Sequence, residues 1–183
     1  MTPAEQTLQP WLEEETLQQA RLAAGPGPGI ARLEEVLPLT GLEYIQGVVT
    51  GKLPYPWMAR TLDFHIMAAS DGRVVFQGAP QLQHTNPMGT IHGGWFASIL
   101  DSAMACAVHT KLPVGRSYTT AELSINLVKA LTPQIVRVRA EAQVLHFGRQ
   151  LATAEGKLFG PDGTLYAHGT TTCLVFETRV PAR

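Results

Sequence analysis

Several marks of well-known protein classes are missing from this sequence of 183 residues. Charged residues make up 16% of it and the formal net charge is −1, so no basic surface points to nucleic acid or to an anionic membrane. Its two cysteines, Cys106 and Cys173, both lie in apolar runs, which argues against a disulfide framework and for reduced thiols in a cytoplasmic protein. Residues 1–15 lack the basic and apolar regions of a secretory signal.

Common catalytic and cofactor signatures are missing as well. The sequence has no phosphate-binding loop, no dinucleotide fingerprint and no serine-nucleophile elbow. Its six histidines show no paired ligand spacing, so we expect neither a metal nor a bound cofactor. Cys106 is expected in the core rather than as a nucleophile, because it lies deep in an apolar run. Surface or structural roles are assigned to His65, His109, His146 and His168.

Hydrophobic residues make up 45% of the chain, enough for one domain with a sizeable core and an appendage. Residues 1–56 are predicted to form a helical extension, with one helix over residues 3–24, a glycine–proline stop and a second helix over residues 42–50. An extended connection then leads to the main domain, residues 57–178. We expect the Trp and Tyr side chains of the extension to pack on this domain or on a neighbouring subunit.

In the main domain, segments with the residue pattern of β-strands precede and follow one apolar helix in the sequence. Asp71-Gly72 indicates a hairpin, and residues 136–144 alternate apolar and polar side chains as in a sheet with one buried face. The strands are predicted near residues 62–69, 73–80, 118–128, 135–145, 151–159 and 165–176, with the helix near 92–110. This order predicts an α+β fold with a mostly antiparallel sheet. We expect the sheet to wrap around the helix, because the helix is apolar nearly all round.

The start of that helix is a candidate binding site for negative charge. His92-Gly93-Gly94 opens it, and the free N–H groups at a helix start, with the positive end of its dipole, stabilise an anion. The two glycines leave this backbone open to a ligand. Small residues also permit tight packing of a helix on a sheet, and the local sequence does not separate these two interpretations.

Asp101 is the one formally charged side chain between Thr85 and Thr110. A buried, unpaired carboxylate tends to have a raised pKa, as expected of a catalytic acid or base. A carboxylate held by a Ser, Thr or backbone partner, or one at a polar subunit interface, would fit the same position. Composition alone leaves both roles open.

The whole segment resembles a known signature, that of the phenylacetate-pathway (PaaI-like) branch of hotdog-fold acyl-CoA thioesterases. The residues that carry the resemblance are Asn86-Pro-Met-Gly89-x-x-His92-Gly93-Gly94, followed by Leu100-Asp101. The similarity extends from about Trp57 to about Phe176. It takes in the strand from Tyr118 to Asn126 and the turn at Gly148-Arg149.

The resemblance implies a role for each matching residue. Asp101 would be the nucleophile or the general base for water, and the Gly93 N–H the oxyanion donor. Asn86 and His92 would position the thioester or the water, and Thr120 would help to hold the water. The role of residues 1–56 is not implied, because they lie outside the shared core.

Coenzyme A would belong to the substrate, so no separate cofactor is implied. Gly148 and Arg149 would lie near its nucleotide. Gly93 and Asp101 are eight residues apart, roughly 12 Å along one helix. An oxyanion donor and a base acting on one carbonyl must lie closer than that, so we expect a homodimer that shares its sites as the minimal unit. A homotetramer built as a dimer of dimers is also expected.

Two other functions fit the same residues. A hotdog dehydratase acting on 3-hydroxyacyl thioesters would pair His92 or His84 with Asp101. A non-catalytic acyl-CoA-binding module would give Asp101 no task. Release of free thiol from acyl-CoA separates hydrolysis from both alternatives.

Overall fold

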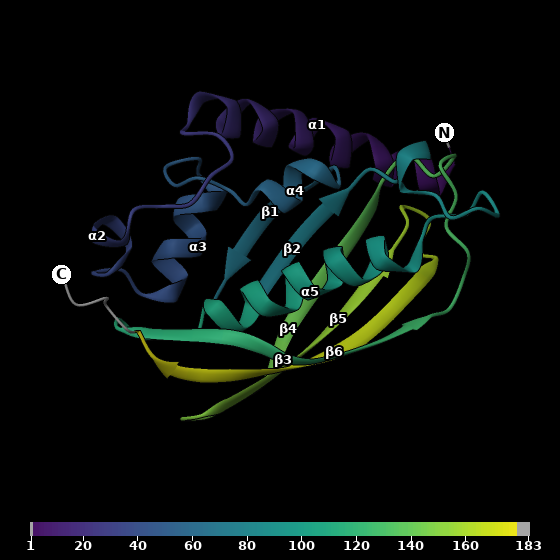
Figure 1. Cartoon of the computed structure of the whole chain (residues 1–183). Coiled ribbons are helices and arrows are strands. Elements are labelled where there is room, and N and C mark those ends of the chain that lie inside the picture. The colour runs from purple at the N-terminus through teal and green to yellow at the C-terminus, as the bar shows by residue number, and fades with distance from the viewer. Residues whose placement is uncertain (1, 179–183) are drawn as a thin grey trace.

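The computed structural model describes residues 2–178, and a six-stranded antiparallel sheet curves around one long helix, α5 (Figure 1). The strand order is β1-β2-β4-β5-β6-β3. The helices are α1 (Pro3–Ala24), α2 (Leu33–Val36), α3 (Gly41–Val49), α4 (Trp57–Thr61) and α5 (Gly93–His109), with a 3-10 helix η1 (Leu82–His84). The strands are β1 (Phe64–Ser70), β2 (Arg73–Gly78), β3 (Arg116–Leu127), β4 (Val138–Phe147), β5 (Leu151–Phe159) and β6 (Leu165–Glu177).

The predicted order of elements and the wrapped helix are confirmed, whereas some boundaries differ. The short helices α2 and α4 were not predicted, and α4 begins at Trp57, where the sequence indicated an extended connection. β1 begins at Phe64 because Asp63, with φ of 51°, turns the chain after α4. β4 begins at Val138 because a turn precedes it. Val136 was therefore wrongly expected to be buried, and it is 48% exposed.

The core lies between α5 and the concave face of the sheet. Nine of the 17 residues of α5 are buried, and α5 contacts every strand. The largest of its fully buried side chains are Phe96, Ile99, Leu100 and Met104. One stripe of α5, with mostly small or polar side chains, stays partly open, and Asp101 lies on it. No helix within residues 2–178 is long and apolar enough to cross a membrane.

The N-terminal extension packs on the main domain, at the β1–β2 end of the sheet (Figure 1). Gln77 and Arg139 are cross-strand neighbours on β2 and β4, and α1 covers them. Glu15 of α1 is buried and accepts hydrogen bonds from Arg137 Nε at 2.5 Å and Gln77 Nε2 at 3.2 Å. The Arg139 guanidinium lies 4.5 Å from the centre of the Trp11 ring. A buried polar network therefore attaches α1.

Removal of the Glu15 carboxylate should destabilise the fold, because Arg137 and Gln77 would lose their buried partner. We expect Glu15→Ala to lower the free energy of unfolding by roughly 3 kcal/mol in denaturant titrations. The control is Glu13→Ala on the exposed side of α1, which should change it by less than about 0.5 kcal/mol. Equal effects of the two substitutions would mean that the network contributes little.

Candidate active site

Asp101 lies half-buried on α5 with one hydrogen-bond partner. Its Oδ1 accepts a hydrogen bond from Thr120 Oγ1 of β3 at 3.1 Å. Within residues 2–178, Oδ2 accepts no hydrogen bond and no cation forms an ion pair with this carboxylate. Burial raises the pKa of Asp101 above its usual value, and the hydrogen bond from Thr120 partly opposes that rise. Such a carboxylate is more basic than an exposed aspartate, and one of its oxygens is free for a ligand.

Thr120 reaches Asp101 because β3 contains a β-bulge. Thr120 pairs with Cys173 of β6 and Leu123 pairs with Thr171, so the strand gains one residue between them, at Ala121. Cys173 and Thr171 are both buried, on the same side of β6. The bulge thus keeps Thr120 and Leu123 on the side that faces α5, whereas regular alternation would turn one of them away.

The start of α5 offers a free backbone donor. His92 is the N-cap, and its Nδ1 accepts a hydrogen bond from the Gly94 N–H at 2.9 Å. The neutral ring therefore carries its proton on Nε2 and can donate it to a ligand. The Gly93 N–H has no acceptor within the described part of the chain. A Cβ on Gly93 would meet Leu127 Cδ1 at 3.3 Å, which shows that this backbone lies beside β3.

Asn86 holds the loop that precedes α5. Its Nδ2 donates to Thr90 Oγ1 at 2.8 Å, and its Oδ1 accepts from the Met88 N–H at 2.9 Å. The Asn86 N–H also donates to the Thr90 carbonyl at 2.8 Å. The side chain orients this loop and keeps a second amide N–H for a ligand.

The predicted catalytic residues fall into two groups along the same helix–strand pair. Thr120 lies beside Asp101 in the middle of α5, and Leu127 lies beside Gly93 at its start. Eight residues of continuous helix separate Gly93 from Asp101, so their backbones are about 12 Å apart. A single chain does not bring the carboxylate and the free N–H to one carbonyl group.

Neither candidate histidine pairs with Asp101 within one chain. His92 caps the start of α5, nine residues before Asp101. His84 is buried, stacks on Trp95 with ring centres 5.9 Å apart, and lies 3.6 Å from an Asp63 carboxylate oxygen. Burial lowers the pKa of His84. The acid–base pair that a dehydratase would use is not assembled in this chain.

Gly148 and Arg149 form the turn between β4 and β5. The Gly148 N–H donates to the Leu151 carbonyl at 2.8 Å, and the Arg149 carbonyl accepts from Arg116 Nη2 at 2.6 Å. The Arg149 side chain is exposed. Arg116 begins β3, so this turn lies at the end of β3 that is remote from Leu127.

Sequence reasoning missed a cavity in the structure, because its lining comes from residues far apart in the chain. His109, two turns beyond Asp101 on α5, stacks on Tyr44 at 4.7 Å and lies 5.2 Å from the Tyr118 ring. These residues line the cavity together with Cys106 and His65, so the role assigned to His65 and His109 was incomplete. The one signal in the sequence was the spacing of His109 from Asp101.

Cys106 is partly buried and packs against the hydrophobic core, where the sequence predicted it. Burial, and to a smaller extent the nearby charge of Asp101, raises its pKa to about 12. It therefore carries no thiolate at neutral pH. Both cysteines are free.

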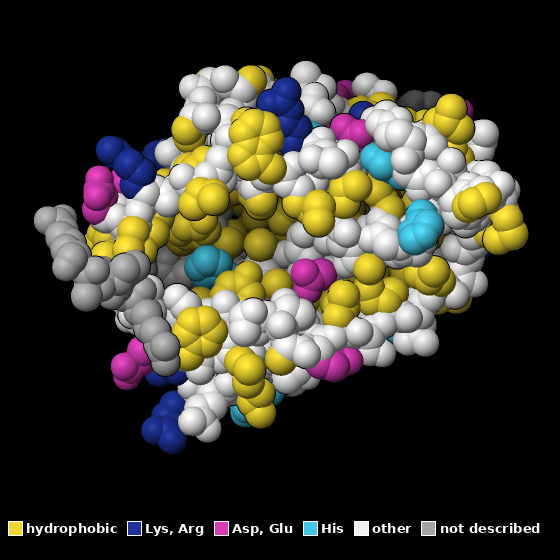
Figure 2. Space-filling model, in the orientation of Figure 1, with side chains coloured by type: hydrophobic (Ala, Val, Ile, Leu, Met, Phe, Trp, Pro, Cys, Tyr) yellow, Lys and Arg dark blue, Asp and Glu magenta, His cyan; other side chains and the backbone are white. Residues whose placement is uncertain are grey.

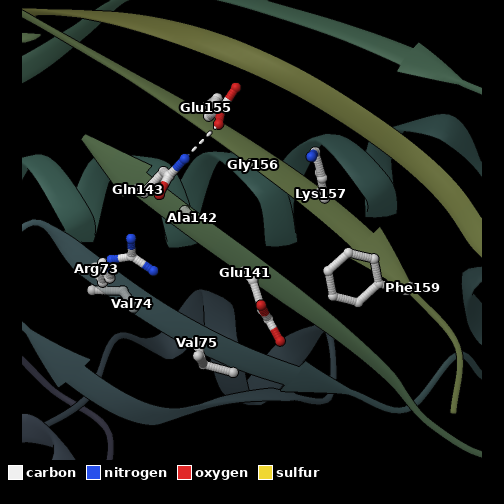
Figure 3. A pocket seen from close by; sticks show the side chains of 10 residues that line it. All are labelled: Arg73, Val74, Val75, Glu141, Ala142, Gln143, Glu155, Gly156, Lys157 and Phe159. Atoms are coloured by element: carbon white, nitrogen blue, oxygen red, sulfur yellow. Dashed lines mark hydrogen bonds between the residues drawn. The ribbon is translucent and has the colours of Figure 1, made fainter. Parts of the chain in front are cut away.

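A second depression lies on the other face of the sheet (Figure 3). Figure 3 shows its side chains in front of the strands, with α5 behind them. Gln143 Nε2 donates to Glu155 Oε1 at 2.6 Å within it. The charged side chains are Arg73, Glu141, Glu155 and Lys157. The sheet separates this surface from Asp101, so it is not part of the candidate site.

Comparison with known proteins supports the predicted resemblance. Residues 88–167 match the family model of the thioesterase superfamily. No curated protein sequence matches the chain. A phenylacetic acid degradation-related protein from Ralstonia eutropha is similar in structure, with 28% identity and a TM-score of 0.66 over 72% of this chain and 98% of its own.

Two further solved structures have the same fold. A variant of the phenylacetic acid degradation protein PaaI from Thermus thermophilus is 25% identical, with a TM-score of 0.57 over 63% of this chain and 96% of its own. A thioesterase family protein from Silicibacter pomeroyi is 24% identical, with a TM-score of 0.60 over 66% of this chain and 89% of its own. The similarity to the Silicibacter protein shows the fold alone.

The raised pKa of Asp101 predicts how its replacement changes stability. A carboxyl group whose pKa is higher in the folded than in the unfolded state destabilises the fold once the pH exceeds the unfolded value. We therefore expect Asp101→Asn to unfold at an equal or higher denaturant concentration than the wild type at pH 7. Any gain in stability of Asp101→Asn over the wild type should shrink as the pH falls towards the ordinary aspartate pKa. A large loss of stability at pH 7 would indicate a structural role for the charge.

Proposed function

We propose that this thioester hydrolase, whose hotdog fold includes a thioesterase-superfamily segment, hydrolyses acyl-CoA with Asp101 as its catalytic carboxylate. The observation that carries the proposal is the half-buried Asp101 carboxylate, held by Thr120 and open at its second oxygen. Nearby hydroxyls are already engaged. Ser98 Oγ donates to the Gly94 carbonyl at 2.8 Å, and Ser102 Oγ donates to the Ser98 carbonyl at 2.7 Å.

Thioester hydrolysis requires a group that activates water or attacks the carbonyl, and a donor for the resulting oxyanion. Ionised Asp101 takes a proton from water as the water attacks, or attacks the carbonyl carbon itself; both routes need its charged form. The Gly93 N–H donates to the oxyanion. The C–S bond then breaks, and the coenzyme A sulfur leaves as a thiolate and is protonated. When water attacks, the acyl group leaves as the free acid. When Asp101 attacks, water then hydrolyses the acyl–Asp101 anhydride, which releases the free acid and restores the carboxylate.

The site becomes complete when two chains pair through β3. This strand is bonded to β6 along one edge, and its other edge is unpaired within residues 2–178. Antiparallel pairing with a second β3, centred halfway between Thr120 and Leu127, places Gly93 beside Asp101 of the partner subunit. Apolar side chains at that end of β3 support the contact. Leu127 is 53% exposed and Val128 is 55% exposed.

The remaining predicted residues support the same proposal. His92 Nε2–H and the free amide N–H of Asn86 lie at the same end of α5 as Gly93, where they can donate to the thioester. The exposed Arg149 guanidinium can bind a phosphate of coenzyme A. Release of free thiol when purified protein meets acyl-CoA tests the function, and a dehydrated acyl-CoA without free thiol would support the dehydratase instead.

Thr120→Ala should change the pH dependence of hydrolysis. The hydrogen bond from Thr120 favours the charged form of Asp101, so its loss raises the pKa further. We expect the acid limb of the kcat/KM profile to move to higher pH, with a smaller loss at the plateau than Asp101→Asn causes. Thr120→Ser, which keeps the hydroxyl, is the control. An unmoved acid limb would show that this hydrogen bond does not tune the catalytic group.

Two inactive variants should complement each other if the site is shared. Asp101→Asn removes the charge, and Gly93→Pro removes the oxyanion N–H at the first helical position, where proline is tolerated. Each should lower turnover by about a hundredfold or more. Gly93→Ala, which adds a Cβ but keeps the N–H, is the control and should lose much less activity than Gly93→Pro.

When the two variants are unfolded together and refolded, half of the random dimers are mixed, and each has one intact site. Roughly a quarter of wild-type activity should return. Differently tagged chains show whether mixing has occurred. Mixed dimers without activity would place the whole site within one chain.

A further inference from the structure

The N-terminal extension supplies almost half of the lining of the cavity beside α5. Its volume is about 340 Å³. The main domain contributes Phe76, Cys106, His109 and Tyr118 among other residues. The extension contributes Leu22, Tyr44, Ile45, Val48, Tyr55 and Pro56, and α4 contributes Ala59. More than half of the lining therefore comes from residues that precede β1.

The cavity adjoins the proposed catalytic carboxylate. Cys106 follows Asp101 by five residues on α5, and Tyr118 precedes Thr120 by two residues on β3, on the same face of that strand. Burial raises the pKa values of Tyr118 and Cys106, and the negative charge of the nearby Asp101 raises both further. Figure 2 shows a hollow lined by hydrophobic side chains, with a histidine and an acidic side chain beside it on this face.

The lining is uncharged at neutral pH. No Asp, Glu, Lys or Arg belongs to it. Burial lowers the pKa of His109 to about 4 and also lowers that of His65, so both rings are neutral at pH 7. A guest that carries a charge would lose its hydration without gaining a partner. The cavity therefore suits an uncharged group.

The wall that the extension supplies is fixed in place. The Gly41 N–H donates to the Leu112 carbonyl at 2.8 Å. A Cβ on Gly41 would lie 1.7 Å from the His109 carbonyl oxygen, so the start of α3 touches the end of α5 directly. Ile45 and Val48 of α3 belong to the main hydrophobic core. The cavity is thus preformed, as small-molecule sites usually are.

We propose that the N-terminal extension forms the acyl-binding pocket of this enzyme and that the pocket selects an uncharged, compact acyl group. At about 30 Å³ for each non-hydrogen atom, the cavity holds roughly ten of them. This corresponds to a medium-chain acyl group or one with a single ring. The inference rests on the proposed hydrolysis at Asp101, because an acyl group in this cavity would extend from a carbonyl held beside that carboxylate.

The experiment compares kcat/KM for a series of acyl-CoAs from acetyl to palmitoyl, measured by thiol release. Octanoyl-CoA and suberyl-CoA form a matched pair, because they have the same chain length and differ by a terminal carboxylate. We expect a maximum between hexanoyl and decanoyl, and at least tenfold preference for octanoyl over suberyl. Absence of thiol release from every substrate would overturn the proposed function itself.

Substitutions at Val48 test the acyl-binding pocket without changing the proposed catalytic residues. Val48 is 5% exposed and lines the cavity, whereas Gln46 on the same helix is exposed. Val48→Phe should lower the octanoyl-to-butanoyl ratio of kcat/KM by at least tenfold, because each excluded methylene loses about fourfold in binding. Val48→Ala should move the maximum to longer chains. Gln46→Phe, which adds the same ring outside the cavity, should leave the profile unchanged.

Opposite shifts for the two Val48 variants would support the pocket. If Val48→Phe fails to fold, the shift of Val48→Ala to longer chains still decides the question. If the wild type hydrolyses acyl-CoA and Val48→Ala has the same chain-length profile, this inference is overturned and the proposed function still stands. A suberyl rate equal to the octanoyl rate would overturn it as well.

Discussion

The enclosure of α5 by the sheet is the constraint on which the rest of the structure depends. A helix surrounded by strands must be apolar, and α5 satisfies this at all positions except along one open stripe. A carboxylate there is partly removed from water, which costs free energy unless partners compensate. Thr120 supplies one hydrogen bond and no cation within residues 2–178 supplies more. The enclosure that stabilises the core therefore also makes Asp101 a stronger base.

β3 connects that carboxylate to the rest of the site. It runs beside α5, with Thr120 next to Asp101 and Leu127 next to Gly93. The bulge at Ala121 keeps both ends of the strand facing the helix. Because β3 is an edge strand, the same element that positions the carboxylate also offers its other edge to a second chain. A two-fold axis near the middle of β3 would exchange the two ends of the strand. It would thereby bring Gly93 of one chain next to Asp101 of the other.

The sequence predicted the elements whose signal is local. α1, α3, α5 and the six strands follow from periodicity and turn residues. A motif of fixed spacing named Asp101 and Gly93 as candidates. The bulge at Ala121 has no local signature, because it is defined by the partner strand. The cavity depends on contacts across the fold, such as Tyr44 with His109. The alternation of β4 extends to Val136 in the sequence and predicted that it is buried. A turn before β4 places Val136 outside the strand, where it is exposed.

The extension holds the β1–β2 end of the sheet from both faces. Glu15 attaches α1 to Arg137 and Gln77 on one face, while Ile45 and Val48 join the core on the other. In this chain, the helices of the extension both attach to the sheet and line the cavity. A substitution that loosens this attachment would therefore alter the cavity too, so stability and acyl preference are coupled through the same segment.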